Sequence, residues 1–111
     1  MRMDMALLDM LPVVICETAA VRDDSGKLID LQWTASNRLM NESIRPDGQS
    51  IVGMRIFEFD PAYKNTEMVR AVTHVIETGE SRSFTTSQGR AAKMLGKIMK
   101  TTVIPVERGS E

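Results

Sequence analysis

The chain has 111 residues, of which 42% are hydrophobic, so we expect a single domain with one core. The formal charge of -1 and the absence of a basic stripe exclude a general nucleic-acid binder. The one cysteine, Cys16, cannot form an internal disulfide, and no apolar run has the length of a membrane span. These features predict a cytoplasmic soluble domain.

The first expected elements are a short helix and a strand. Asp4 can cap a helix within residues 1–11, and Pro12 limits how far it runs. The apolar side of this helix consists of Leu7, Leu8 and Leu11. Residues 13–21 are expected to form the first strand. Its start, Val13-Val14-Ile15, is continuously apolar and indicates burial on both faces at that end.

The stretch from Gly26 to Asn37 carries the clearest local signal. Residues 23–26 read Asp-Asp-Ser-Gly, which is typical of a turn. Residues 28–36 alternate with a period of two, which predicts a strand with unlike faces. The apolar side holds Ile29, Leu31, Trp33 and Ala35, and the polar side holds Asp30, Gln32, Thr34 and Ser36. Asn37 is a good N-cap for a short helix ending near Ser43.

The middle of the chain is expected to contain a loop, a short connection and one long helix. Residues 45–48 contain strong helix breakers and predict a loop. Residues 51–61 predict an irregular or short-helical connection, held in the core by Ile51, Met54, Ile56, Phe57 and Phe59. Asn65 can cap one long helix over residues 66–78, and Gly79 ends it. The apolar stripe of that helix consists of Met68, Val69, Val72, Val75 and Ile76.

Two further strands are expected towards the end of the chain. Residues 81–87 predict one strand, with Phe84 as its large apolar side chain. Residues 97–106 are rich in β-branched side chains and predict the other. Residues 91–96 between them fit either a helical turn or an extension of a strand. Residues 107–111 form a polar tail that we expect to fray.

Three segments, taken in order, resemble the PAS family of sensory domains. Ala35-Ser36-Asn37 resembles the PAS strand that enters its first helix through an asparagine. Residues 51–54 and 59–61 resemble the connection in which a glycine and an apolar pair precede a proline. Residues 77–80, Glu-Thr-Gly-Glu, resemble the end of the long PAS helix. The resemblance covers residues 9–106.

The resemblance implies an α+β (α/β) fold with an antiparallel sheet of about five strands. Short helices and one longer helix would cover one face, with an N-terminal cap helix over residues 1–11 and the PAS core over residues 12–106. Family members usually have a fifth strand after the segment that matches residues 101–106, where this chain has only a polar tail. The sequence is then either a piece of a longer chain, which we favour, or a short sheet with an open edge.

Haem and flavin, which other PAS domains bind, are not expected here. His74 is the only histidine and lies on the long helix, but at about 100° per residue it falls about 160° from the stripe centre and faces solvent. Flavin-binding members carry a cysteine in an Asn-Cys-Arg motif, whereas residues 37–41 read Asn-Arg-Leu-Met-Asn. Cys16 is expected to be a small, buried hydrophobic residue. The sequence has no metal-spaced cluster and no nucleophile–base pair, so neither a metal nor catalysis is expected.

The apolar side of the second strand has two interpretations. Trp33 belongs to the core, or lines a pocket, if that side faces the helices. If it faces outward, the N-terminal helix of the same chain or of a partner covers it, and the resemblance favours this case. The dimer-interface candidates are then Leu7, Leu8, Leu11, Leu31 and Trp33. The pocket candidates are Gln32, Thr34, Asn37, Met54 and Val72.

These features predict a PAS-like signalling module that mediates dimerisation and senses a small ligand. Such a module would supply the input to a larger signalling protein, whose catalytic domain would lie beyond Glu111. The expected partner is a second copy, bound through the N-terminal helix and the outer sheet face, and neither nucleic acid nor membrane is expected. The alternative is a protein-interaction adaptor without a ligand.

Overall fold

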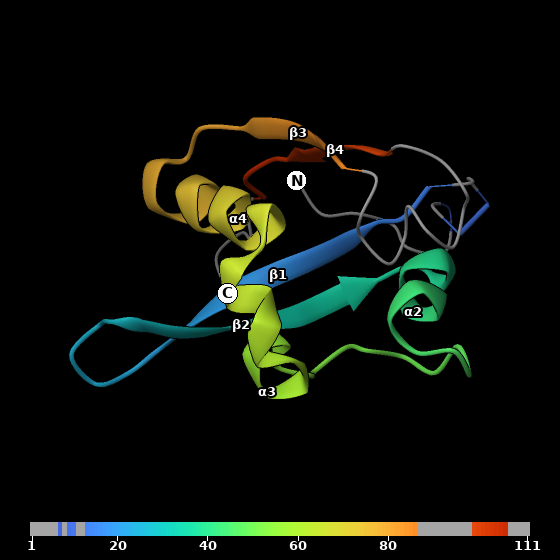
Figure 1. The fold of residues 1–111 in the computed structure, drawn as a ribbon, viewed down its shortest axis with the longest axis horizontal. Helices are drawn as coiled ribbons and strands as arrows, with labels where there is room; N and C mark the ends of the chain where they lie inside the picture. The colour runs from blue at the N-terminus through green and yellow to red at the C-terminus, as the bar shows by residue number, and fades with distance from the viewer. Residues whose placement is uncertain (1–6, 8, 11–12, 87–98, 107–111) are drawn as a thin grey trace. The chain divides into compact units, whose positions relative to one another are not determined.

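The computed structural model describes residues 7, 9–10, 13–86 and 99–106. These residues form a small α+β fold with two antiparallel two-stranded sheets and three α-helices (Figure 1). The chain divides into two compact units. The first is Met5–Tyr63, and the second is Lys64–Glu111 together with Met1–Asp4. Among the described residues, no helix is both long and apolar enough to cross a membrane.

The first unit is built on a β-hairpin. Strands β1 (Cys16–Arg22) and β2 (Leu28–Ser36) pair antiparallel, with Glu17 opposite Ala35. The turn forms as the sequence predicts: the Asp23 carboxylate accepts bonds from the amides of Ser25 and Lys27, and Gly26 has a φ of 88°. The bounds of β2 match the predicted strand, because the alternating pattern and the turn both lie in the local sequence.

The first strand begins three residues later than the sequence predicts. The Asn37 side chain donates to the carbonyl of Val13 and accepts from the amide of Ile15. These two backbone groups therefore bond to a side chain instead of a neighbouring strand. Val13 is exposed and Ile15 is only half-buried, so the prediction of burial on both faces was wrong at this end.

Two short helices and a 3-10 turn follow the hairpin. Helix α2 (Arg38–Ile44) starts at the predicted N-cap Asn37. Helix α3 (Ile56–Phe59) lies within the connection over residues 51–61 that was predicted to be irregular or short-helical. The 3-10 helix η1 (Pro61–Asn65) follows it and was not predicted. The chain before α3 runs along β2 on the side away from β1. Trp33 donates its amide to the Met54 carbonyl and accepts from the Gly53 amide, so this edge of β2 is partly paired.

Both faces of β2 contribute to the core of this unit. Leu31 and Trp33 have 0% exposed surface, so the chain itself covers this side of β2, and the Trp33 ring packs against Phe59 of α3. Asp30, on the opposite side of the strand, is also buried. Of the residues predicted to hold the connection in the core, Ile51 and Ile56 are buried, and Met54, Phe57 and Phe59 are half-buried.

The second unit consists of one long helix and a hairpin. Helix α4 (Glu67–Thr78) contacts both strands of the sheet formed by β3 (Arg82–Thr86) and β4 (Met99–Val103). Both strands lie within their predicted ranges. Residues 87–98 and 107–111, and with them the open question at 91–96 and the predicted tail, lie outside the described residues. The buried side of α4 matches the predicted stripe at Val69, Val72 and Val75, together with Ala71.

The ends of α4 test two local predictions. Gly79 ends the helix in the left-handed region with a φ of 74°, as predicted. The predicted N-cap, Asn65, was wrong by one residue. Thr66 is the N-cap, and its side chain accepts a bond from the Val69 amide at 3.3 Å. Asn65 instead ends η1 and is exposed.

Thr66→Ala should therefore destabilise the protein more than Asn65→Ala. Loss of an N-cap hydroxyl costs about 1 kcal/mol of unfolding free energy. Asn65→Ala, the matched control, removes an exposed side chain and should change that free energy by less than about 0.5 kcal/mol. Urea denaturation measures both. A larger loss for Asn65→Ala would show that Asn65 is the cap.

Candidate functional site

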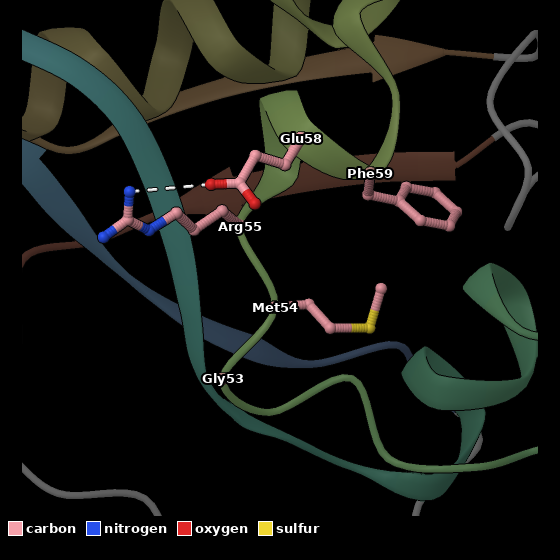
Figure 2. A pocket seen from close by; sticks show the side chains of 5 residues that line it. All are labelled: Gly53, Met54, Arg55, Glu58 and Phe59. Carbon is pink, nitrogen blue, oxygen red and sulfur yellow. Dashed lines mark ion pairs between the residues drawn. The ribbon is translucent and has the colours of Figure 1, made fainter.

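A shallow hollow of about 360 Å³ lies in the first unit where the chain turns into α3 (Figure 2). Its lining residues are Gly53, Met54, Arg55, Glu58 and Phe59. Met54 and Phe59 extend to one side of the segment, and the charged side chains lie on the other. The Arg55 guanidinium and the Glu58 carboxylate form an ion pair at 3.5 Å. The apolar side chains and the ion pair therefore lie on opposite sides of the segment.

The Phe59 side chain packs into the core of the unit. The Phe59 ring packs edge-on against Trp33, with 6.0 Å between ring centroids and an interplanar angle of 67°. On another side, Phe59 lies 6.3 Å from the ring of Tyr63. Such aromatic pairs favour offset and edge-on geometries. A molecule that displaced Phe59 would therefore disturb the environment of the buried Trp33.

A buried carboxylate positions the helix that borders the hollow. The N-cap of α3, Arg55, makes no side-chain capping bond. Asp30 supplies the bond from β2 instead: its Oδ1 accepts from the Phe57 amide at 2.9 Å and from the Leu31 amide at 2.7 Å. The first turn of a helix has amides without internal partners, and a carboxylate suits them. Asp30 thereby ties α3 to the strand beside it.

Asn37 joins three segments near the start of α2. It is 1% exposed. Its Oδ1 accepts from the Met40 amide at 3.0 Å and from the Ile15 amide at 3.1 Å, and its Nδ2 donates to the Val13 carbonyl at 2.7 Å. The predicted cap is therefore present, and the same side chain also binds the segment before β1. All of these bonds are internal to the protein.

Asn41, one turn later on α2, has a similar role that the sequence analysis missed. Its Oδ1 accepts from the Ser36 hydroxyl at 2.6 Å and from the Ile51 amide at 3.1 Å. The spacing of four residues from Asn37 places both side chains on the same side of α2. In the sequence, this spacing was the only signal for the role of Asn41. It does not reveal that the partner is the amide of Ile51.

The predicted pocket residues are divided between the two units. Met54 lines the hollow, and Gln32 donates to the carbonyl of Gly53, which also lines it. Thr34 bonds to Glu17 at 2.9 Å, and Asn37 is occupied as described above. Val72 is a buried residue of the second unit. The hollow therefore contains one of the five predicted pocket residues in its lining and has a second beside it.

The structure describes three of the predicted dimer-interface residues. Leu7 is 62% exposed, whereas Leu31 and Trp33 are buried within the chain. Leu8 and Leu11 lie outside the described residues. Leu7 has helical backbone, and the Met10 amide bonds to its carbonyl at 3.1 Å. Leu7 is thus the described member of the predicted set that a second copy could reach.

Cys16 is half-buried at the start of β1. Burial raises the pKa of its thiol from 9.0 to about 12; the neighbouring Glu17 carboxylate adds to the rise, and the Trp33 indole N–H opposes it. That N–H is itself buried and has no partner with hydrogen-bond geometry among the described residues. A thiol with a raised pKa is a poor nucleophile because it forms little thiolate. This environment agrees with the prediction of Cys16 as a small hydrophobe.

His74 lies near the end of α4 and is less exposed than the sequence predicts. Its Nε2 lies 3.7 Å from a Glu80 carboxylate oxygen and 3.5 Å from an Arg82 guanidinium nitrogen. The side chain is half-buried, because the turn after α4 returns past it. Within the described ranges there is no group of three or more His, Cys, Asp or Glu side chains that could hold a metal ion.

The chain was compared with protein families, curated proteins and solved structures. No protein-family model, curated protein or solved structure matches the chain.

The raised pKa of Cys16 predicts a pH dependence of stability. Between pH 9 and about pH 12 the unfolded chain releases the thiol proton and the folded chain retains it. The stabilisation is therefore complete below pH 9 and is lost as the pH rises, by at most about 1.4 kcal/mol per pH unit.

Urea denaturation from pH 8 to pH 10.5 measures this slope, with Cys16→Ala as the control because it lacks the thiol. The wild type should lose stability faster than the variant above pH 9. Parallel curves for the two proteins would contradict a raised pKa of the Cys16 thiol.

Proposed function

We propose that this chain is a PAS-like sensory or signalling module that mediates dimerisation and takes a small ligand. The supporting observation is the order of its elements: a hairpin, an asparagine-capped short helix, a second short helix, a long helix and then two strands. This is the order that the sequence resemblance implies. The finer arrangement, one antiparallel sheet of about five strands with helices on one face, is part of the proposal. A two-stranded hairpin is marginally stable alone, so each sheet would gain from further pairing.

The proposed dimer contact is the N-terminal segment. Leu7 and Met10 are 62% and 80% exposed, and large apolar side chains on a short segment are suited to a partner surface. The Asp9 carboxylate between them accepts from the Arg38 amide at 2.6 Å, at the start of α2. This bond fixes the segment on the first unit. A conformational change at the start of α2 would therefore move the proposed contact segment through this hydrogen bond.

The proposed ligand site is the hollow beside α3. A ligand can shift an equilibrium only if it binds two arrangements with different affinity. Phe59 offers a way to do so, because it lines the hollow and also packs on Trp33. We propose no catalytic residue and no cofactor. Chemistry would belong to a further domain of a larger signalling protein. The alternative proposal is an adaptor that dimerises without a ligand.

Native mass spectrometry of the wild type and of Leu7→Asp tests this proposal. The wild type should give a dimer mass, and the aspartate variant should give a monomer, because two carboxylates would be buried against apolar surface. Val52→Asp is the matched control, since Val52 is 50% exposed on a turn elsewhere in the unit. It should remain a dimer.

The same spectra separate the two candidate functions. Additional mass on the dimer supports a ligand sensor, and a dimer without it supports the adaptor. A monomeric wild type, or a Leu7→Asp dimer as stable as the wild type, would contradict dimerisation through this segment.

A further inference from the structure

We infer that Met10 is a modification site, at which a hydroperoxide oxidises the thioether to the sulfoxide and thereby weakens the dimer. The inference rests on the proposed function, because it names a way in which the proposed dimer contact is regulated. Three observations carry it: the exposure of Met10, the lower exposure of other methionines, and the position of Met10 beside Leu7.

Met10 is the most accessible methionine among the side chains that the structure describes. It is 80% exposed. Met40 is only 6% exposed, and its sulfur lies 3.8 Å from the Ser43 hydroxyl oxygen. Met54 and Met68 are half-buried. An oxidant must reach the sulfur atom to react, so Met10 should be oxidised before these three.

The reaction requires a hydroperoxide and no other reagent. The sulfur lone pair attacks one peroxide oxygen, so that an S–O bond forms and the O–O bond breaks. The second oxygen leaves with the peroxide proton, as water or as an alcohol. Sulfur is oxidised and the peroxide is reduced by the same electron pair. The product is a polar side chain whose oxygen accepts hydrogen bonds.

The position of Met10 places this new polar group in the proposed dimer contact. Its amide donates to the Leu7 carbonyl at 3.1 Å, within one turn of the backbone. Residues three positions apart in such a turn lie on the same side, so one partner surface would cover both side chains. Burial of an oxygen acceptor without a hydrogen-bond partner is unfavourable. A symmetric dimer contains the group twice.

Oxidation should leave the attachment of the segment to the first unit intact. Asp9 accepts from the Arg38 amide at 2.6 Å, and this bond does not involve the sulfur atom. The sulfoxide would therefore change the contact surface of a monomer that stays folded. Because the dimer covers Met10, the oxidant reacts with the monomer, and dimerisation and oxidation oppose each other.

Native mass spectrometry before and after treatment with hydrogen peroxide tests the inference, and peptide mass spectrometry locates the added oxygen. Met10 should gain oxygen before Met40. The dimer dissociation constant should then rise at least about tenfold. Oxidation of Met10 should slow as the protein concentration rises, because the dimer protects it. Methionine sulfoxide reductases should restore the dimer.

Three variants separate this effect from general oxidative damage. Met10→Leu keeps an apolar side chain without sulfur, so its dimer should persist before and after peroxide treatment. Met10→Gln carries a polar side chain of similar length, so its dimer should be at least about tenfold weaker without peroxide. Met54→Leu is the matched control, because it removes a half-buried methionine of the same unit. It should respond to peroxide as the wild type does.

Three results would overturn the inference alone. They are a wild-type dimer that is unchanged after oxidation of Met10, loss of the Met10→Leu dimer on peroxide treatment, and oxidation of Met40 as fast as that of Met10. A wild type that is monomeric before any treatment would instead overturn the proposed dimerisation, and this inference with it. The spectrum of the untreated protein therefore distinguishes the two failures.

Discussion

The side chain of Asn37 is the constraint on which the first unit depends. It caps α2, and it also provides partners for an amide and a carbonyl of the segment that precedes β1. These groups are 22 and 24 residues away in sequence. Buried backbone groups without partners are costly, so an amide side chain with both an acceptor and a donor is suited to this position. Aspartate could cap the helix but could not donate to Val13.

Two other polar side chains extend the same principle towards the hollow. Asn41 connects α2 to the end of β2 and to the amide of Ile51. Asp30 connects β2 to the first turn of α3. The hollow lies between these fixed points, on a segment whose backbone also bonds to Trp33. Its position is therefore set by specific hydrogen bonds and by the contact of Phe59 with the core.

Features determined by neighbouring residues were predictable from the sequence. The bounds of β2, the cap at Asn37 and the stop at Gly79 follow from alternation, turn chemistry and capping preference. The face occupied by Trp33 was not predictable, because alternation separates two faces without saying which one is covered. The cap of α4 was misplaced because Asn65 and Thr66 are both competent caps. The partners of Asp30 and Asn41 lie 27 and 10 residues away, beyond any local pattern.

Amide hydrogen exchange at Ile15 and Met40, in the wild type and in Asn37→Ala, tests the central constraint most directly. Both amides bond to the same Asn37 oxygen, so both should exchange slowly in the wild type and lose protection together in the variant. The Gly79 amide, which bonds to the Val75 carbonyl in the second unit, is the internal control and should keep its protection. Rapid exchange at Ile15 in the wild type, or an unchanged rate at Ile15 in Asn37→Ala, would contradict the account.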